Sequence, residues 1–573
     1  MPLTIGIDVG GTNTDAVLVS ARGVHKKAKI PTIKDNLLQS VLEALEAVYD
    51  PHSEKNLERI CISTTLTTNS IVEENYDKVG LLCLPGPGLH PKYLPFHESM
   101  EILPGYVDHR GRIVKDLNPN TVRQAVEKFL KKDIKRFAVV GKFSNRNPEL
   151  EMKIHDLIIG EYSDVKHISL GHRVTSRIGF PRRIATAYLN AAVYRKHKEF
   201  ADAVENALGS KGITAPVFIL KGDGGTINLE ASRRLCVHTI LSGPAASIMG
   251  EITLTGEHPA AALIDIGGTT TDIAIMLNGS PVFERSGAEI SGYKTSVRAL
   301  FSRSIGIGGD SAVKVENGVL QIGPHREGPA VIFGGNTPTP TDAAAALGKV
   351  PCADPKVAKE ALKPLADSLN VTIKKTAELI IEETAQSIAN AVKNIVVSLS
   401  NRPVYTVKEV LEPLVIELQK LIGIGGPSPV LTPLVAEKLG IDYEIAPVHQ
   451  VANAVGAAAA RPTTVATVHC DTSTGYYSIS ELGIKKEIGK KNWNIDKVTA
   501  IAKKAVEKRA RSRTGYQDID FSREVEITTH EEFNVVRGFQ TVGKIMEVKA
   551  QIKPGAVFSL THWKEGEEND HSS

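Results

Sequence analysis

The sequence predicts an α/β protein built from two related lobes. One octapeptide occurs twice, as Asp-Val-Gly-Gly-Thr-Asn-Thr-Asp at residues 8–15 and as Asp-Ile-Gly-Gly-Thr-Thr-Thr-Asp at residues 265–272, and six of the eight positions are identical. Apolar runs of strand length flank both copies, and segments with helical periodicity lie between such runs. Copies about 250 residues apart indicate two related halves, because solenoid repeats span only about 20–50 residues.

The elements around the octapeptides are expected in chain order. The strands are 3–7 and 16–19 around the first copy, and 261–264 and 273–277 around the second. Residues 36–49 and 376–399 carry apolar side chains at helical spacing, so each is expected to form an amphipathic helix. Strands mixed with such helices are typical of an α/β architecture, and a cleft is expected between the lobes.

Three parts are expected along the chain. They are an N-terminal lobe at 1–185, a second lobe at 186–462 and a C-terminal appendage at 463–573. Beyond about Pro462 the sequence becomes polar and lysine-rich and contains no further glycine turn of this kind, and the tail 565–573 is expected to fray.

Composition favours a globular protein that acts on a small molecule. The chain has 573 residues, of which 42% are hydrophobic and 23% charged, and its net charge is only +3. This balance gives no reason to expect nucleic acid or an anionic membrane as a partner.

The cysteines and the N-terminus indicate a cytoplasmic protein. The five cysteines, at 61, 83, 236, 352 and 470, contain no Cys-x-x-Cys pair, so neither a disulfide framework nor a zinc site is expected. The chain reaches Asp8 before an apolar leader could form, and no apolar run approaches the roughly 18 residues of a membrane span.

Each octapeptide has the residues of a phosphate and metal site. A glycine pair permits a tight turn whose backbone N–H groups can bind phosphate, and the threonine hydroxyls add donors. The expected phosphate-binding residues are Gly10, Gly11, Thr12, Asn13 and Thr14 in the first copy and Gly267, Gly268, Thr269, Thr270 and Thr271 in the second. A single Gly-Gly-Thr turn is often only structural, but two copies facing each other would form a clamp.

The aspartates of the octapeptides are the candidate catalytic residues. Asp8 and Asp265 are expected to organise Mg²⁺, directly or through water, because Mg²⁺ bound to a nucleotide commonly takes one or two carboxylates. Asp15 and Asp272 either orient the attacking oxygen or cap the hairpin.

Two further glycine clusters are weaker candidates. Gly425 and Gly426 lie in a glycine turn that leads into a helix and could face a nucleotide base or sugar, and Gly308 and Gly309 form a similar turn. The motifs of P-loop, dinucleotide-binding, serine hydrolase and zinc protease sites are absent, so those classes are disfavoured.

A phosphate loop duplicated across two lobes resembles the actin, Hsp70 and sugar kinase superfamily. More narrowly, residues 1 to about 462 resemble the A-type subunit of the hydantoinase and oxoprolinase family. The segments that carry this resemblance, besides the octapeptides, are 64–70, 143–149, 223–225, 241–246, 328–330, 341–343 and 423–428.

The resemblance implies a fold and an activity. Two ribonuclease-H-like lobes would close on ATP with Mg²⁺ or Mn²⁺, and the chain would act in an oligomer with a B-type partner subunit. The implied reaction is ATP-dependent hydrolysis of a cyclic amide or imide, such as a hydantoin, 5-oxoproline or a lactam. A ketone carboxylase subunit, a reactivating or chaperone-like ATPase and a small-molecule kinase are the alternatives.

Departures from the family pattern concern the substrate side. Val331 and Ile332 replace the usual Cys-Tyr, Ile62 and Ser63 replace the usual His-Gly, and Asp310 interrupts a Gly-Gly-Gly-Ser segment. We therefore expect the segments 62–115 and 306–342 to determine the substrate.

Overall fold

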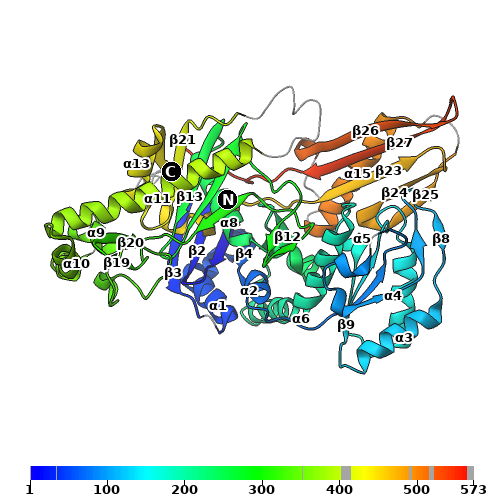
Figure 1. The fold of residues 1–573 in the computed structure, drawn as a ribbon, viewed down its shortest axis with the longest axis horizontal. Coiled ribbons are helices and arrows are strands. Elements are labelled where there is room, and N and C mark those ends of the chain that lie inside the picture. The colour runs from blue at the N-terminus through cyan, green and yellow to red at the C-terminus, as the bar shows by residue number, and fades with distance from the viewer. Residues whose placement is uncertain are drawn as a thin grey trace.

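The computed structural model describes residues 2–33, 35–88, 90–351, 353–401, 415–489, 493–514 and 522–563. Cys352 and the tail 565–573 lie outside these residues. Figure 1 shows two α/β lobes next to each other, with a smaller α/β unit and a C-terminal sheet at the other end of the molecule. The expected α/β class and two-lobed architecture are confirmed.

The first sheet carries the first octapeptide at the turn of its central hairpin. Its strand order is β12 (Thr226–Asn228), β11 (Val217–Leu220), β4 (Leu57–Thr64), β1 (Leu3–Val9), β2 (Asn13–Ser20) and β3 (Gly23–Pro31). β1 pairs antiparallel with β2 and parallel with β4. The predicted first helix is confirmed as α1 (Leu37–Val48), which begins where the Asn36 side chain caps the Gln39 N–H.

The second sheet repeats this arrangement. Its order is β15 (Ser280–Pro281), β14 (Thr271–Leu277), β13 (Ala260–Ile266), β21 (Lys420–Ile424) and β22 (Asp442–Ile445), and β18 (Ser302–Ile305) also pairs with β14. β13 pairs antiparallel with β14 and parallel with β21, as β1 does with its neighbours. The helices of this lobe include α9 (Pro340–Ala346), α10 (Pro355–Leu369), α11 (Ile373–Ser400) and α13 (Ser428–Leu439). The predicted strands and the helix at 376–399 are confirmed.

Two helices join the lobes at close range. They are α8 (Ser242–Thr255) and α14 (Ala452–Ala459). A Cβ added at Gly250 would lie 2.2 Å from the Ala452 carbonyl oxygen, and one added at Gly6 on β1 would lie 2.0 Å from that of Ala454. Glycine at these two positions lets α14 lie close to both α8 and β1. This close packing fixes the two lobes relative to each other.

A small α/β unit interrupts the first lobe. Its parallel strands run in the order β10 (His167–Leu170), β9 (Arg136–Gly141), β5 (Gly80–Leu84) and β6 (Met100–Ile102), with α3 (Pro119–Leu130) and α4 (Glu149–Glu161). The expected boundary at residue 185 falls inside the next helix, α6 (Phe180–Ser210). Because β11 and β12 follow α6 and complete the first sheet, we propose that the first lobe extends through β12.

The C-terminal part forms its own antiparallel sheet. The order is β25 (Ile484–Glu487), β24 (Tyr476–Ile479), β23 (Val465–Asp471), β27 (Gln540–Ile552) and β26 (Val525–Arg537), and α15 (Ile495–Thr514) packs on it. β23 begins at Val465, close to the expected start of the appendage at 463.

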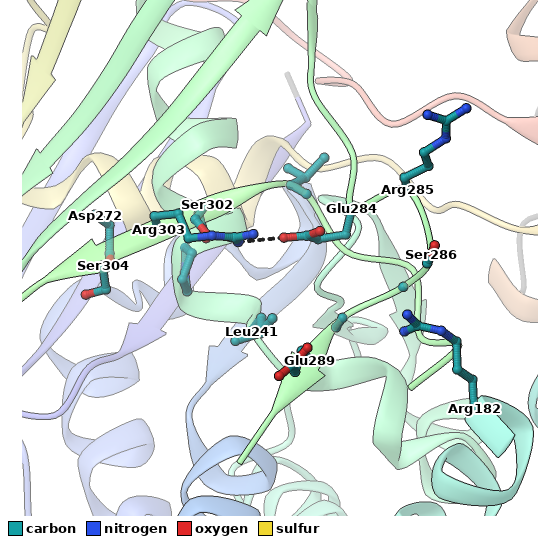
Figure 2. Close-up of a pocket in the computed structure, with 14 residues that line it drawn as sticks. Arg182, Leu241, Asp272, Glu284, Arg285, Ser286, Glu289, Ser302, Arg303 and Ser304 are labelled. Atoms are coloured by element: carbon teal, nitrogen blue, oxygen red, sulfur yellow. Dashed lines mark hydrogen bonds and ion pairs between the residues drawn. The ribbon is translucent and has the colours of Figure 1, made fainter. Parts of the chain in front are cut away.

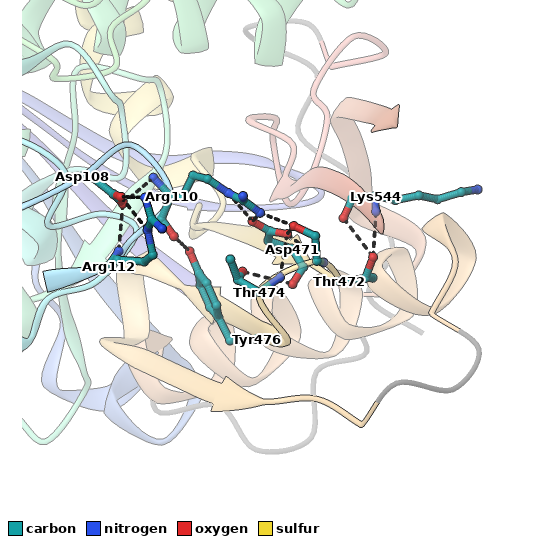
Figure 3. A network of polar contacts seen from close by, with 9 residues as sticks. Asp108, Arg110, Arg112, Asp471, Thr472, Thr474, Tyr476 and Lys544 are labelled. Atoms are coloured by element: carbon teal, nitrogen blue, oxygen red, sulfur yellow. Dashed lines mark hydrogen bonds and ion pairs between the residues drawn. The ribbon is translucent and has the colours of Figure 1, made fainter. Parts of the chain in front are cut away.

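Charged contacts hold this sheet against the inserted unit (Figure 3). The Arg110 Nη2 donates to Asp471 Oδ2 at 2.6 Å, and the Tyr476 hydroxyl donates to the Arg110 carbonyl oxygen. Arg146 Nη1 lies 2.7 Å from Glu547 Oε2. These contacts hold the C-terminal sheet on the inserted unit and involve no residue of the two octapeptides.

The state of the cysteines and the composition of the helices can be compared with the expected cytoplasmic location. Cys61, Cys83, Cys236 and Cys470 are buried free thiols. Across the part of the chain that the structure describes, no helix combines the length and apolar composition needed to cross a membrane. The cytoplasmic location stays a prediction.

Candidate active site between the lobes

The two octapeptides close two β-hairpins in the same way. In the first, the Gly10 N–H donates to the Asn13 carbonyl oxygen at 3.0 Å. In the second, the Gly267 N–H donates to the Thr270 carbonyl oxygen at 2.9 Å. The repeated sequence therefore gives the same turn, with its glycine pair at the same place, in each lobe.

Four carboxylates lie at matching positions of these hairpins. The strand register puts Asp8 opposite Asp15 and Asp265 opposite Asp272. Directly opposed residues of antiparallel strands point to the same face, so each hairpin presents a pair of carboxylates. Asp8 and Asp15 are buried, and the other two are half-buried.

Electrostatics indicates that the two pairs share one site. The pKa of Asp8 is raised to about 7, mainly by burial and further by the charges of Asp15 and Asp265. The pKa of Asp272 is raised to about 6 by burial and by the charge of Asp265. Such charge effects weaken with distance, so Asp8 of the first lobe and Asp265 of the second lie within electrostatic reach of each other.

The two joining helices position Asp265 of the second hairpin. Asp265 Oδ2 accepts hydrogen bonds from Ser247 Oγ on α8 at 2.6 Å and from Asn453 Nδ2 on α14 at 3.1 Å. Glu251, one turn after Ser247, is fully buried, and burial together with the charge of Asp265 raises its pKa well above the ordinary value. Asp8 Oδ1 is buried with no hydrogen-bond partner among the described residues.

These carboxylates fit a divalent cation that is bound partly through water. In the described ranges, no three His, Cys, Asp or Glu side chains form a metal site by themselves. Mg²⁺ bound to a nucleotide needs only one or two carboxylates, because water and phosphate oxygens complete its shell. Asp8 offers an unpartnered oxygen, and a cation would relieve the repulsion between Asp8 and Asp265.

The hairpin tips are accessible. Gly11, Thr12 and Thr270 are exposed, while Asn13 and Thr269 are half-buried. A Cβ added at Gly11 would meet no atom within 4 Å, so the tip of the first hairpin faces open space. These five residues have the exposure that phosphate binding requires.

Two of the expected phosphate ligands are already engaged within the protein. Thr14 is fully buried, and its hydroxyl shares a 2.9 Å hydrogen bond with that of Thr32. Thr271 is also fully buried, and its hydroxyl donates to the Ile307 carbonyl oxygen at 2.7 Å. The structure therefore places both threonines where they hold the hairpins.

The glycines at 308 and 309 pack behind the second hairpin. The Gly309 and Asp310 N–H groups donate to the Gly267 and Gly268 carbonyl oxygens at 2.9 and 2.6 Å. A Cβ added at Gly308 would lie 2.5 Å from the Gly267 carbonyl oxygen. This turn supports the second hairpin from behind, and the Gly309 N–H is already used in a hydrogen bond to that hairpin.

The turn at 425 and 426 borders Asp265. Gly425 has a φ of +90°, and a Cβ there would lie 3.0 Å from Asp265 Oδ1 and 2.2 Å from the Ile266 carbonyl oxygen. Gly426 faces open space, since a Cβ there would meet no atom within 4 Å. The open side of Gly426 fits the approach of a nucleotide.

An arginine links the two lobes at the hairpin tips. Arg326 Nη1 donates to Thr12 Oγ1 of the first hairpin at 3.0 Å. Its Nη2 donates at 2.9 Å to Oδ2 of Asp310, the residue that buttresses the second hairpin. A phosphate bound between the tips would therefore lie near a cation.

Sequence reasoning missed the residues that surround the aspartates. Ser247 and Glu251 are four residues apart on α8, just after the recognised segment 241–246, so helical spacing could have found them. Asn453 is the only polar side chain of the apolar helix α14, which is also a readable signal. Arg326 carries no local pattern, because its contacts are made across the chain fold.

A cavity of about 690 Å³ lies beside Asp272 (Figure 2). Its walls come from Arg182 on α6, the start of α8, Asp272 and the segment 284–304. A second, much smaller pocket of about 10 Å³ has Asp265, Glu251 and Asp272 in its walls. None of the fourteen lining residues belongs to 62–115 or 306–342, the segments expected to determine the substrate.

Two family models with the same family description match this chain. Residues 183–465 match Hydantoinase/oxoprolinase, and residues 4–161 match the Hydantoinase/oxoprolinase N-terminal region. The chain is 28% identical over 449 residues to the acetophenone carboxylase gamma subunit of Aromatoleum aromaticum, covering 68% of this chain and 60% of that subunit. It is 26% identical over 387 residues to the caprolactamase subunit alpha of Pseudomonas jessenii, and this match covers 60% of this chain and 54% of that subunit. The chain thus spans less than two thirds of the length of these relatives.

Two solved structures share the fold over almost the whole chain. Nucleotide-free acetone carboxylase has a TM-score of 0.68 at 17% identity, covering 98% of this chain and 88% of that chain. The ATP-dependent caprolactamase from Pseudomonas jessenii has a TM-score of 0.69 at 19% identity, covering 96% and 87%. At these identities the likeness establishes the fold alone.

Proposed function

The chain belongs to the hydantoinase/oxoprolinase family, and from that premise we propose that it is the ATP-binding subunit of an enzyme that hydrolyses a cyclic amide or imide. The relatives named above are subunits of a caprolactamase and of a ketone carboxylase, which supports an enzymatic role with a partner subunit of the B type. The observation that carries the proposal is that two hairpins of nearly the same sequence each present a pair of carboxylates, with Asp8 of the first within electrostatic reach of Asp265 of the second.

Phosphoryl transfer from ATP would overcome the low reactivity of the amide. The amide carbonyl is a poor electrophile, but phosphorylation of its oxygen gives an imidate phosphate that water can attack. Catalysis of that transfer depends mainly on positioning and on neutralising charge. Asp8 and Asp265 would hold Mg²⁺ or Mn²⁺, and the cation would neutralise the phosphate oxygens.

The protein residues have separate roles in this proposal. Thr12 and Thr270 at the exposed tips bind the phosphates, with the neighbouring backbone N–H groups. Asp272 faces the cavity and orients the attacking oxygen there. Asp15 is held by Lys29 Nζ, at 2.8 Å from its Oδ1, and acts as a structural cap.

ADP release tests the proposal. The purified chain, with and without a co-encoded B-type subunit, is supplied with Mg-ATP and hydantoins, 5-oxoproline, lactams or ketones. We expect ADP, phosphate and a ring-opened acid with one of the cyclic amides. A stable phosphorylated product would instead indicate a kinase, and ATP turnover stimulated only by another protein would indicate a reactivating ATPase.

Ketone carboxylation is the second candidate. The acetophenone carboxylase subunit matches a larger share of this chain than the caprolactamase subunit does. Strict dependence of ADP release on both a ketone and bicarbonate would establish this reaction in place of hydrolysis.

A further inference from the structure

The strand β26 forms the outer edge of the C-terminal sheet. The strand order of this sheet ends at β26, and no other strand in the part of the chain that the structure describes pairs with its outer side. An edge strand exposes unpaired backbone N–H and C=O groups that can add a strand from another chain. Short length, proline and lysine commonly protect such edges, but β26 is 13 residues long and contains neither proline nor lysine. Its outer side is therefore open to a further strand.

The hairpin of β26 and β27 lies at the periphery of the molecule. β23 pairs with β27 along 545–551, whereas β26 and β27 pair with each other as far as Arg537 and Gln540. Figure 1 shows the turn of this hairpin at the edge of the molecule, away from the sheets that carry the octapeptides. A second molecule could therefore approach β26 without covering the octapeptides.

Large apolar side chains are exposed along the outer part of this hairpin. The exposed fraction is 58% for Phe533 and 56% for Val536, and Phe539 in the turn is fully exposed. Successive side chains of a strand point to opposite faces, so Phe533 and Val536 lie on opposite faces of the sheet. A strand added beside β26 would cover apolar surface on both faces, which favours its addition.

Two charged side chains of β26 lack an ion pair within the chain. Glu531 and Arg537 are exposed, and neither forms an ion pair with another described residue. The register places Glu531 directly opposite Glu547 of β27, and like charges at opposed positions of neighbouring strands repel each other. Glu532, by contrast, is paired with Lys544 at 2.6 Å between Oε1 and Nζ. A cation on the outer side of Glu531 would offset the repulsion.

The outer part of β26 alternates regularly between the two faces of the sheet. Its pairing with β27 shifts between Val535 and Val536, but the extra residue is Val542 on β27. The odd-numbered residues of the segment therefore share one face: Glu531, Phe533, Val535 and Arg537.

We propose that β26 pairs antiparallel with β26 of a second copy of this chain, which joins the two C-terminal sheets across a two-fold axis. In such a pair, residues at equal distances from the axis on either side face each other. With Asn534 on the axis, Glu531 faces Arg537 of the second copy. In the same register, Phe533 faces Val535 of the second copy. Each contact occurs twice, because the two copies are equivalent.

The strand is self-complementary around Asn534. Glu531 lies three residues before Asn534 and Arg537 lies three residues after it, so the pairing creates two ion pairs from a single sequence. Phe533 and Val535 flank Asn534 directly and form two apolar contacts in this register. The Asn534 carboxamide can both donate and accept a hydrogen bond, so it can pair with its own copy. Because the acid and the base lie at matching distances on one strand, a second copy is the occupant that this charge pattern fits.

The mass of the full chain in solution tests the proposal. Sedimentation equilibrium over a wide range of protein concentrations should show a monomer–dimer equilibrium. Glu531→Arg and Arg537→Glu each place like charges at both symmetric contacts, so each should raise the dissociation constant of the dimer about tenfold or more. The double variant Glu531→Arg/Arg537→Glu reverses both charges and should restore the wild-type dissociation constant. Misfolding of the single variants could not produce this restoration.

A charge reversal at the other edge of the same sheet is the matched control. Lys486 is exposed on β25, so Lys486→Glu should leave the dissociation constant unchanged. None of these measurements depends on ATP turnover, so they test the β26 contact separately from the proposed function.

Any of three results would overturn the proposal. They are a full chain that remains a monomer at every concentration, single variants that dimerise as the wild type does, and a double variant that fails to restore the dimer. If the chain stays monomeric and Glu531→Arg instead weakens binding of the co-encoded B-type subunit, the edge of β26 binds that partner and not a second copy.

Discussion

The two hairpins have nearly the same sequence but different support. The second is buttressed from behind, where its Gly267 and Gly268 carbonyl oxygens accept hydrogen bonds from Gly309 and Asp310. The first is held within its own sheet, where the Thr32 N–H donates to the Thr12 carbonyl oxygen at 2.9 Å. Local sequence thus determines the turn, and the packing behind it determines how firmly the turn is held.

The carboxylates show the same contrast. Asp15 of the first hairpin is paired with Lys29, whereas Asp272 at the matching position of the second faces the cavity. Asp265 accepts two hydrogen bonds, whereas Asp8 has a buried oxygen without a partner among the described residues. The duplicated residues therefore have different chemical roles, and four experiments can test this comparison.

The largest effect is expected where the hairpins are proposed to act alike. Asp8→Ala and Asp265→Ala should each lower substrate-dependent ADP release by about a thousandfold, because each removes a group that organises charge in the transition state. Asp442→Asn, an exposed aspartate on the edge strand β22, is the control and should leave turnover unchanged. Full activity in either alanine variant would show that one hairpin does not handle phosphate.

The pH dependence of the free energy of unfolding should reveal the contribution of Asp8. Its pKa rises from an ordinary value of 3.8 to about 7 on folding, so the stability it contributes is present below pH 3.8 and lost as the pH rises through 7. Asp8→Asn mimics the protonated group, so its stability should be close to that of the wild type at pH 4 and should exceed it at pH 8 by about 4 kcal/mol. Urea unfolding at both pH values, without metal or nucleotide, measures this difference. Equal stability of the two proteins at pH 8 would contradict the burial argument.

Alanine at one glycine of each region tests the difference in support. Gly308→Ala should lower the free energy of unfolding by about 1–3 kcal/mol, because the added Cβ would lie 2.5 Å from a backbone oxygen of the second hairpin. Gly11→Ala should change it by less than about 0.5 kcal/mol, because no atom lies within 4 Å of the new Cβ. Thermal and urea unfolding of the pair give the result, and equal destabilisation would remove the distinction between the hairpins.

The smallest effect is expected from the link between the tips. Arg326→Gln breaks the contacts to Thr12 and Asp310, and this partly exposed ion pair is expected to contribute only about 1 kcal/mol to stability. Stability should change little, while the KM for ATP should rise by about a factor of five if the guanidinium also meets phosphate. Arg326→Lys should restore part of the affinity. An unchanged KM in Arg326→Gln would restrict this residue to linking the lobes.

Much of this arrangement was readable from the sequence. The strands on either side of each octapeptide and the helices α1 and α11 follow from short-range patterns. A hairpin forms between residues a few positions apart, so its sequence carries nearly all the information about its geometry. The family resemblance could be stated for the same reason, since it rests on these segments.

The surroundings of the hairpins were decided by the tertiary structure. Gly308 and Gly309 resemble a binding turn in sequence but serve as a buttress, and Thr14 and Thr271 are buried away from the tips. The cavity lies along 284–304 and beside Arg182, not along the segments where the sequence departs from the family.

The sequence by itself thus determined two hairpins, four aspartates and a two-lobed α/β fold. Only the tertiary structure decided which helices hold Asp265, what packs behind the second glycine pair and which segments line the cavity beside Asp272. The physical reason is distance along the chain. Asn453 is 188 residues from Asp265, and Arg326 is 314 residues from Thr12, so no local pattern encodes these contacts.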